Sequence, residues 1–309
     1  MTAQVHLGLD VGGTASRWTA CSADGTVLRT GSGSGASGHV FNPAEKTKFS
    51  NVLDRLGAEL SAADLIPVSL TAGLTGYGTP AAAELRQLTA ETLHLDPAAI
   101  LFIDDISLAY LANFQPGEGH LVSAGTGSIG LHWSASEQIR VGGRGILIDD
   151  AGSGSWIALR ALDRIYRSLD HTGSFAEVEP LARHLLTAIG GTDWQDVRSF
   201  VYAGDRGRIG TLATAVAGAA EEGDASALAI LEQAGADLAL LAKALAARAG
   251  DRPVGFIGGV LRLHPVIVDS IGAHLPPAEV RILDADASLA AAHLQTASDG
   301  QWRSILSGS

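Results

Sequence analysis

Apolar and polar residues alternate along two similar stretches of the chain, with the period of a strand that buries one face. "VHLGLDVGGTASRWTACSADGTVLRTG", residues 5–31, predicts a strand, a Gly-Gly-Thr turn, a second strand, a turn at Ala23 to Gly25 and a third strand. "GHLVSAGTGSIGLHWSASEQIRVGG", residues 119–143, repeats that order around a Gly-Thr-Gly-Ser turn. Two domains of similar topology are the simplest explanation, and two unrelated glycine-rich hairpins are the alternative.

Helical patterns fill the intervals between these strands. A chain of 309 residues suits two domains of about 150 residues each, and strands mixed with helices in both halves predict the α/β class. The predicted helices are Ala44–Leu60, Thr79–Thr92, Ile106–Asn113, Ser155–Leu169, a helical block Phe175–Ala249 and a last helix near Ser288–Ala297.

The residues of the second glycine turn match the spacing of a well-known motif but not its structural context. Gly125, Gly127 and Gly130 spell G-x-G-x-x-G, which binds a dinucleotide when the glycines end a strand and open a helix. Here Ile129 and Leu131 continue with a period of two, so the glycines join two strands. The pattern therefore predicts a hairpin and not a dinucleotide-binding loop.

Composition and charge exclude several classes of protein. Hydrophobic residues make up 46% of the chain and charged residues 17%, which is typical of a globular protein with sizeable cores. The formal net charge of -12 argues against nucleic acid and anionic membrane surfaces as partners. The single cysteine, Cys21, permits no internal disulfide and no Cys-rich metal or iron–sulfur site.

No membrane or export signal is expected from the hydropathy pattern. The start "MTAQVHLGLD" has no basic segment followed by an apolar run, so no secretory signal is visible. The most apolar helical stretch, residues 225–249, is interrupted by Glu232, Gln233, Asp237 and Lys243, which favours a packed amphipathic helix over a membrane span. We therefore expect a cytoplasmic protein.

Glycine turns of this kind favour phosphate binding. Backbone amides approach phosphate oxygens closely where no Cβ intervenes, and a Thr or Ser hydroxyl adds a donor. The pattern G-x-x-x-x-G-K-[ST] is absent, so a P-loop is excluded as the source of phosphate binding. Asp10, just before Gly12, Gly13 and Thr14, is placed to bind Mg²⁺ directly or through water, and capping of the turn is its alternative role.

Five segments together carry a resemblance to a known family. "GLDVGGT", "FIDDISLAYLA", "SAGTGSIG", "VGGRGILIDDAGSGSWIALRAL" and "GFIGGVL" follow one another along nearly the whole chain. In this order they resemble the N-acetylglucosamine and glucosamine kinases of the BadF/BadG/BcrA/BcrD group, within the actin-like, sugar kinase and Hsp70 superfamily. The resemblance implies two ribonuclease-H-like (actin-like ATPase) domains, residues 1–114 with the C-terminal helix 288–309 and residues 115–287 with a helical insertion. It places ATP and a sugar in a cleft between them.

The resemblance also assigns roles to individual residues. Asp105, after the apolar strand "ILFID", becomes the base for the sugar hydroxyl, while a helix N-cap is its alternative role and Asp104 is the weaker candidate for the base. The predicted cofactors are ATP and Mg²⁺. The residues expected to bind ATP are Gly12, Gly13, Thr14, Gly125, Thr126, Gly127, Ser128, Gly258 and Gly259, the last two as the adenosine motif.

The sugar-binding residues depart in part from the family pattern. The resemblance places Gly143, Arg144 and Asp150 at the sugar, but N-acetylglucosamine kinases commonly carry Trp where Arg144 stands, and pairing with an aspartate is the alternative role of Arg144. In the loop "SGASGHVFNP" either Gly38 or Asn42 takes the place of a sugar-contacting Asn. If it is Gly38, then Ser37 or His39 is the expected substitute.

These observations predict an ATP-dependent kinase for the 6-hydroxyl of glucosamine. The Gly-Gly-Arg sequence resembles glucosamine kinases, and Asp149 with Asp150 offers a carboxylate to a protonated amine. N-acetylglucosamine, another sugar or a sugar acid are alternative substrates, and a non-enzymatic ATP-binding regulator is a further alternative. A dehydratase-activating ATPase and a zinc-containing sugar kinase need several cysteines and are disfavoured. The expected partner is a small sugar, and a homodimer is one expectation for the assembly.

Overall fold

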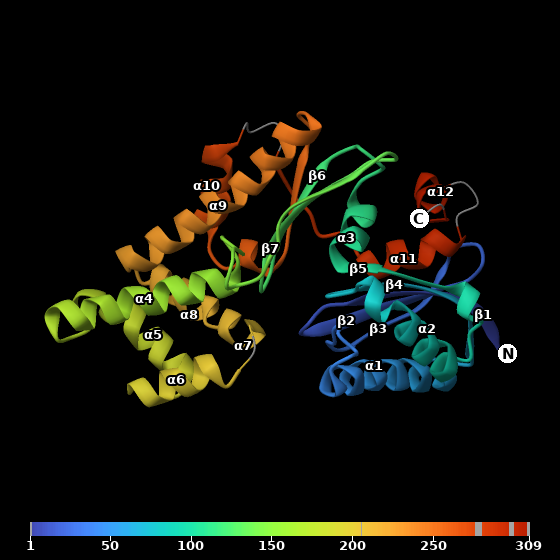
Figure 1. Cartoon of the computed structure of the whole chain (residues 1–309), viewed down its shortest axis with the longest axis horizontal. Helices are drawn as coiled ribbons and strands as arrows, with labels where there is room; N and C mark the ends of the chain where they lie inside the picture. The colour runs from blue at the N-terminus through green and yellow to red at the C-terminus, as the bar shows by residue number, and fades with distance from the viewer. Residues whose placement is uncertain (1, 205, 276–279, 297–299, 308–309) are drawn as a thin grey trace. The chain divides into compact units, whose positions relative to one another are not determined.

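The computed structural model describes residues 2–204, 206–275, 280–296 and 300–307. The chain divides into two compact units (Figure 1). Unit 1 consists of residues 1–117, 133–135 and 284–309, and unit 2 consists of residues 118–132 and 136–283. The domain boundaries named above stay a prediction.

Unit 1 is built on a mixed five-stranded sheet of order β3-β2-β1-β4-β5. The first three strands form an antiparallel meander, and β4 and β5 continue the sheet parallel to β1. Polar turns separate the first strands, as the alternating pattern predicts. The strands are β1 (Ala3–Val11), β2 (Ala15–Cys21), β3 (Val27–Ser34), β4 (Leu65–Leu74) and β5 (Ile100–Asp104).

Helices cover both faces of this sheet (Figure 1). Val5, Leu7 and Leu9 are fully buried in one core with Phe49 and Leu53 of α1. The alternate position Gly8 faces α11, where a Cβ would collide with the backbone of Ser288, so only glycine lets this helix lie so close. The helices of unit 1 are α1 (Pro43–Ala62), α2 (Thr79–Leu93), the 3₁₀ turn η1 (Pro97–Ala99), α3 (Asp105–Asn113), α11 (Ala287–Thr296) and α12 (Gln301–Ser307).

The last predicted helix therefore returns to the first sheet. The Thr19 hydroxyl on β2 and the Ser288 hydroxyl on α11 lie 2.7 Å apart, a buried hydrogen bond between the start and the end of the chain. α11 thus packs on the first sheet, and the predicted last residue of this helix, Ala297, lies outside the described residues.

Unit 2 repeats the same arrangement with a sheet of order β10-β9-β6-β7-β8. β6 and β7 pair antiparallel, with Ala124 opposite Ser128, so the glycines between them close a hairpin. The rejection of a dinucleotide-binding loop is confirmed, because no helix follows these glycines. The strands are β6 (His120–Ala124), β7 (Ser128–Trp133), β8 (Gln138–Gly142), β9 (Val254–Ile257) and β10 (Val280–Ile282).

The predicted helical block lies in the sequence between β8 and β9 of unit 2. α9 is the one helix in the described residues that is long and apolar enough to cross a membrane, with a mean hydropathy of 1.4. Its residues Leu231, Leu238 and Leu245 are fully buried inside unit 2, so α9 is a core helix as predicted. The helices are α4 (Gly154–Thr172), η2 (Ala176–Val178), α5 (Glu179–Ile189), α6 (Trp194–Tyr202), α7 (Arg206–Gly210), α8 (Ala213–Glu221), α9 (Ala225–Ala249), η3 (Gly259–Arg262) and α10 (Pro265–His274).

Candidate active site

Carboxylates gather at one edge of the unit 1 sheet. Asp10 is paired with Gly73 of β4, and Leu74 is paired with Asp104 of β5, so the carboxyl ends of three parallel strands lie in register. Asp10 and Asp105 therefore stand at the same edge, separated by β4. Burial first, and then the nearby Asp105 and Asp286 carboxylates, raise the pKa of Asp10 while Arg17 lowers it, and together these effects bring the pKa to about 6.

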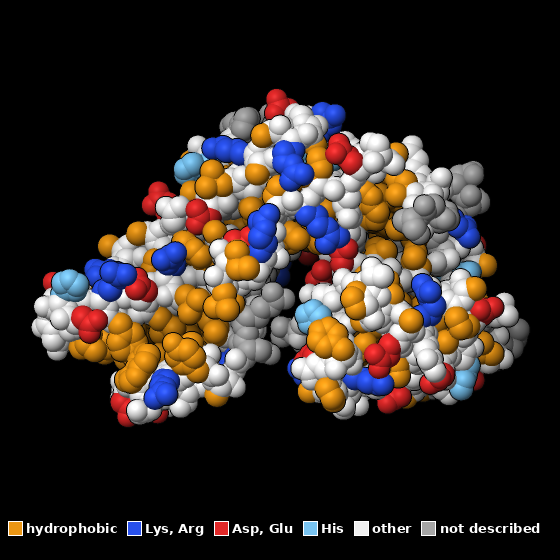
Figure 2. All heavy atoms as spheres, in the orientation of Figure 1, with side chains coloured by type: hydrophobic (Ala, Val, Ile, Leu, Met, Phe, Trp, Pro, Cys, Tyr) orange, Lys and Arg blue, Asp and Glu red, His pale blue; other side chains and the backbone are white. Residues whose placement is uncertain are grey.

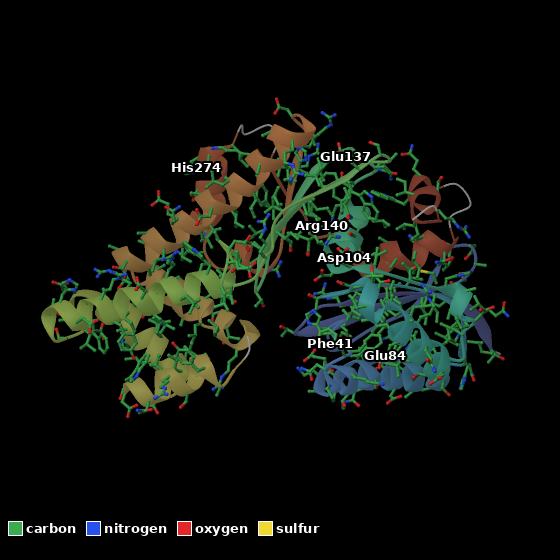
Figure 3. The ribbon with its side chains drawn as sticks, viewed as in Figure 1. Phe41, Glu84, Asp104, Glu137, Arg140 and His274 are labelled. Atoms are coloured by element: carbon green, nitrogen blue, oxygen red, sulfur yellow. The ribbon has the colours of Figure 1, made fainter. Side chains whose placement is uncertain are left out.

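The sequence left two roles open for Asp104 and Asp105, the N-cap of the helix and the base for the sugar hydroxyl. Asp104 is the N-cap of α3, and its carboxylate accepts hydrogen bonds from the backbone N–H and the hydroxyl of Ser107, at 2.9 and 3.0 Å. Figure 3 shows Asp104 where β5 leads into α3. Asp105 is already the first helical residue, so the N-cap interpretation of Asp105 is wrong, while its role as a base stays a prediction.

The Asp105 carboxyl is held in a site that favours its protonated form. Burial raises its pKa, a hydrogen bond from Thr75 lowers it, and the neighbouring Asp104 raises it. Its Oδ1 also accepts a hydrogen bond from the N–H of Ile106 at 2.9 Å. A partly buried carboxyl whose pKa lies above its ordinary value is typical of general acid–base chemistry.

Thr75 links the segments around these acids. Its backbone N–H donates to the carbonyl of Val11 at 3.0 Å, and its own carbonyl accepts the N–H of Gly38 at 2.8 Å. Sequence reasoning did not single out Thr75, and its position directly after β4 at the sheet edge was the available signal. Asp286, which caps α11 through the N–H of Ser288 at 2.9 Å, was missed because it lies far from Asp10 in the sequence.

The loop before α1 shows why its register was ambiguous. Gly38 is buried, and a Cβ there would meet the backbone of Tyr77 at 2.9 Å, so no side chain fits at this position. Asn42 is exposed and is the N-cap of α1, with its Oδ1 accepting from the N–H of Ala44 at 3.0 Å. The cap uses only the Oδ1 of Asn42 and leaves its amide nitrogen available for a ligand. Contact between Asn42 and sugar stays a prediction.

Ser37 and His39, the two proposed substitutes for the sugar-contacting Asn, differ in how their side chains are engaged. The Ser37 hydroxyl donates to Glu45 at 2.7 Å, which occupies it. The ring of His39 lies against Gly76 and 5.5 Å from the ring of Phe41, an exposed side chain labelled in Figure 3. His39 is therefore the better placed of the two to meet a ligand.

The first glycine turn presents open backbone. Gly12 donates to the carbonyl of Ala15 at 2.9 Å and closes the hairpin, while Gly35 and Ala36 brace it by donating to Thr14 and Gly12. A Cβ on Gly13 would meet no atom within 4 Å, so the backbone at Gly13 faces open space. An unobstructed glycine in a tight turn leaves its peptide groups accessible to an anion.

The second glycine turn is held against the start of α4. The N–H groups of Gly154 and Ser155 donate to the carbonyls of Gly125 and Thr126 at 2.9 and 3.2 Å. The Ser128 hydroxyl donates to the carbonyl of Ala151 at 2.7 Å, so this predicted ATP ligand is already engaged within the unit. As at Gly13, a Cβ on Gly125 would meet no atom within 4 Å.

Asp150 lies beneath this turn. Its carboxylate accepts from the N–H of Ser128 at 3.4 Å, and a Cβ on Gly127 would come 3.0 Å from its Oδ2. Asp150 is buried and has a φ of +60°, a left-handed conformation that is unusual outside glycine and that often marks a functional position.

Arg144 and Asp149 form a salt bridge, which is the alternative role predicted for Arg144. The guanidinium Nη1 donates to Asp149 Oδ2 at 3.1 Å, and the backbone N–H of Arg144 donates to Oδ1 at 2.7 Å. The N–H of Asp150 donates to the same Oδ1 at 2.6 Å. The adjacent Gly143 is exposed with a φ of +71°, and its contact with sugar stays a prediction.

The remaining predicted ATP residues follow β9. Gly258 has a φ of +114°, and a Cβ there would collide with the backbone of Ala124 at the end of β6. Only glycine fits this position. Gly259 begins η3, and a Cβ there would meet no atom within 4 Å. The structure thus brings Gly258 beside the strand that leads into the second glycine turn.

Solved structures resemble this chain over nearly its full length. A candidate N-acetylglucosamine kinase from Chromobacterium violaceum is 27% identical with a TM-score of 0.70, over 95% of this chain and 99% of that chain. A candidate N-acetylglucosamine kinase from Porphyromonas gingivalis is 18% identical with a TM-score of 0.71, over 92% and 96%. A ROK family glucokinase from Streptomyces griseus, in complex with glucose and AMPPNP, is 16% identical with a TM-score of 0.57, over 94% and 98%.

These likenesses confirm the predicted fold class. Both units carry a mixed five-stranded sheet covered by helices, which is the actin-like ATPase arrangement of two ribonuclease-H-like domains. No curated protein is similar enough to this chain to count as a match. The model of the BadF/BadG/BcrA/BcrD ATPase family matches residues 7–279, and the chain therefore belongs to that family.

Proposed function

We propose that this protein is an ATP-dependent kinase that transfers a phosphoryl group to a hydroxyl of an amino sugar. The observation that carries the proposal is Asp105, a partly buried carboxyl with a raised pKa that is not used as a helix cap. Support comes from the 27% identity to a candidate N-acetylglucosamine kinase over nearly the whole chain.

The role proposed for Asp105 is to take the proton of the acceptor hydroxyl. Phosphoryl transfer needs the phosphates and the acceptor held in line, and a carboxylate that accepts the acceptor's proton. The raised pKa of Asp105 suits this task, because a base works best when its pKa lies close to the working pH. The hydrogen bond from Thr75 stabilises the carboxylate form of Asp105 and opposes the rise in its pKa.

ATP is proposed to bind through the backbone of the glycine turns. Gly13 in unit 1 and Gly125 in unit 2 each have room for a phosphate oxygen where a Cβ would stand. Gly258 and Gly259 are proposed to lie at the adenosine. Thr14, Thr126 and Ser128 are the hydroxyl-bearing residues of these turns, although Ser128 already donates to Ala151.

Asp10 is proposed to hold Mg²⁺, the ion that neutralises charge on the transferred phosphates. Within the described residues, no group of three or more His, Cys, Asp or Glu side chains is arranged to bind a metal ion. That fits Mg²⁺ bound to ATP, which takes one or two carboxylates together with phosphates and water. Burial and the nearby Asp105 and Asp286 carboxylates raise the pKa of Asp10, and a bound cation would favour its ionised form.

The choice between glucosamine and N-acetylglucosamine depends on Asp149. A preference for glucosamine requires a carboxylate that meets the protonated amine, but Arg144 and two backbone N–H groups already engage Asp149. Glucosamine stays our predicted substrate on the Gly-Gly-Arg sequence. The expected preference is now modest, and N-acetylglucosamine is the second candidate because the 27% identical relative carries that name. The cytoplasmic location and a homodimer stay predictions.

The decisive experiment measures ATP consumption by the purified protein with and without added sugar. Glucosamine, N-acetylglucosamine, a neutral hexose and a sugar acid are compared, and the product is identified as a 6-phosphate. ATP hydrolysis that no sugar stimulates, with no phosphorylated sugar formed, favours the ATP-binding regulator instead. Asp105→Asn serves as the control, because it is expected to slow sugar phosphorylation roughly 10²-fold or more and to keep ATP binding.

A further inference from the structure

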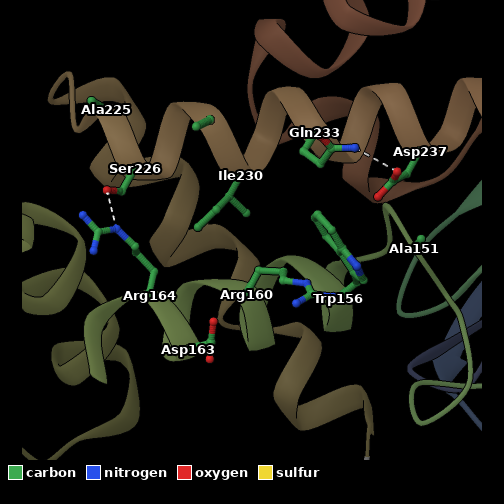
Figure 4. A pocket seen from close by; sticks show the side chains of 11 residues that line it. Ala151, Trp156, Arg160, Asp163, Arg164, Ala225, Ser226, Ile230, Gln233 and Asp237 are labelled. Carbon is green, nitrogen blue, oxygen red and sulfur yellow. Dashed lines mark hydrogen bonds between the residues drawn. The ribbon is translucent and has the colours of Figure 1, made fainter. Parts of the chain in front are cut away.

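A groove of about 790 Å³ lies between α4 and α9 in unit 2 (Figure 4). Its size falls within the usual range for small-molecule sites. None of the residues proposed above for ATP or sugar lines it. The lining residues are Ala151, Trp156, Arg160, Asp163, Arg164, Ala225, Ser226, Ala229, Ile230, Gln233 and Asp237.

The groove is formed by two facing stripes of side chains. Trp156, Arg160 and Arg164 follow one another at four-residue steps, which places them on one face of α4. Opposite them, α9 contributes small residues at one end and Ile230 in the middle (Figure 4). Eight residues of helix span about 12 Å, so Trp156 and Arg164 mark the two ends of an elongated site.

Its positive charges have no acidic partners. The Arg160 guanidinium lies over the Trp156 ring, 5.4 Å from its centre, and Arg164 donates only to the Ser226 hydroxyl at 3.1 Å. Neither guanidinium forms a salt bridge within the described part of the chain. The two acids that line the groove have other partners, since Asp163 pairs with Arg167 at 2.8 Å and Asp237 accepts from Gln233, a neighbouring lining residue, at 3.0 Å.

Arg160 and Arg164 therefore place positive charge without an acidic partner in this groove, although the chain as a whole has a net charge of -12. Figure 2 shows hydrophobic and Lys or Arg side chains next to one another over the α4 and α9 part of the surface. An apolar wall with an aromatic ring favours a flat apolar group, and guanidinium groups favour an anion.

We propose that this groove binds a small anion that carries a flat aromatic ring. The ring packs between Trp156 and Ile230, and the acidic group accepts hydrogen bonds from Arg160 and Arg164. A carboxylate and a phosphate share this chemistry. The site is independent of the proposed sugar kinase activity.

A pair of dyes with similar rings and different charge tests the proposal. 8-Anilinonaphthalene-1-sulfonate is an anion, and N-phenyl-1-naphthylamine is its neutral counterpart. We expect the anion to bind one site per chain, at least tenfold tighter than the neutral dye, by fluorescence titration. Competition by 2-naphthoate and by 2-naphthyl phosphate then shows which acidic group the site prefers.

Variants connect the binding to this groove. The double substitution Arg160→Gln with Arg164→Gln is expected to weaken the anion at least tenfold and to leave the neutral dye unchanged. Arg198→Gln on α6, an exposed arginine outside the groove, is the matched control and is expected to change neither. Ile230→Trp fills the groove from α9 and is expected to displace both dyes without altering either arginine.

The proposal is overturned if the double arginine variant binds the anion as the parent protein does, or if Ile230→Trp leaves both dyes bound. Circular dichroism of each variant reports whether it folds. If the double variant does not fold, Ile230→Trp alone still decides the result, because it keeps both arginines and changes only the space between the helices.

Discussion

The two glycine turns occupy equivalent places in two sheets of the same strand order, yet they differ in charge and support. In unit 1 the strand before the turn carries Asp10, and the turn is braced by Gly35 and Ala36. In unit 2 the equivalent position is the uncharged Ser123, and the turn is braced by the first residues of α4.

We propose that the two turns have different roles. We propose that the unit 1 edge serves proton and metal chemistry, since burial and neighbouring carboxylates raise the pKa of Asp10 to about 6 and raise that of Asp105 as well. At the unit 2 turn Ser123 stands in place of Asp10, and the nearest carboxylate, Asp150, already accepts from the N–H of Ser128. We propose that the open backbone at Gly125 takes a phosphate there. Substitutions in the two turns are therefore expected to have different effects.

The largest expected effect follows from Asp105→Asn. Asparagine keeps the size of the side chain but does not accept a proton, so kcat should fall roughly 10²- to 10⁴-fold. ATP affinity should stay within about twofold of the parent protein. Single-turnover rates with each candidate sugar and calorimetric ATP titration measure the two quantities.

Asp104→Ala is the matched control for that prediction. It removes the N-cap of α3 and should lower the free energy of unfolding by about 1 kcal/mol without a comparable loss of kcat. If Asp104→Ala loses as much turnover as Asp105→Asn, the assignment of the base to Asp105 is wrong.

The next effect concerns stability and pH. The pKa of Asp10 is about 6 in the folded protein against an ordinary value of 3.8, so ionised Asp10 destabilises the fold. This penalty is absent below about pH 4, grows between pH 4 and 6, and amounts to up to about 3 kcal/mol above pH 6. Asp10→Asn should therefore stabilise the metal-free protein at pH 7 and not at pH 4.

Denaturant unfolding in EDTA at pH 4 and pH 7 measures this gain. The equivalent change in unit 2, Ser123→Asn, removes no charge and should show no gain that depends on pH. An Asp10→Asn gain of equal size at both pH values would show that something other than ionisation of Asp10 is responsible.

Some of these features were predictable from the sequence because they depend on local chemistry. The hairpin at Gly125 and Gly127 follows from the period of two in Ile129 and Leu131, and α9 follows from its amphipathic pattern. Asp10 and Asp105 were identifiable because Asp10 lies one residue before the end of β1, Asp105 directly follows β5, and each adjoins a motif.

Other features depend on contacts between distant segments. Asp286 approaches Asp10 only because α11 packs on β1, and no sequence pattern reports that neighbour. The ambiguity between Gly38 and Asn42 had a similar origin, since the lack of space at Gly38 comes from Tyr77 in another loop. The N-cap role moved from Asp105 to Asp104 because helix starts vary by a residue or more in sequence patterns.

A smaller effect is expected from the glycine turns themselves. Gly13→Ala and Gly125→Ala each place a methyl group in open backbone space and should weaken ATP about tenfold, or about 1.4 kcal/mol. The loss at Gly13 should depend on Mg²⁺, since Asp10 is nearby, while the loss at Gly125 should not. Calorimetric titration of ATP with and without Mg²⁺ measures both.

Gly272→Ala on α10 is the matched control, because its Cβ also meets no atom within 4 Å and it lies outside both turns. Gly127 is less suitable for this test, since a Cβ there would press on Asp150. Equal losses of ATP affinity in Gly272→Ala and the two turn variants would remove the support for a phosphate site at the turns.

The smallest expected effect is on sugar preference, and it extends the comparison to the charged residues of unit 2. Arg144 is exposed and its pair with Asp149 is a surface salt bridge, which contributes at most about 1 kcal/mol. Arg144→Ala releases the Asp149 carboxylate, so the ratio of kcat/KM for glucosamine to that for N-acetylglucosamine should rise, by no more than about fivefold. Asp149→Asn removes the carboxylate and should lower the same ratio. Steady-state kinetics with both sugars on the two variants give the result, and a ratio that neither variant changes would show that Asp149 does not meet the amine.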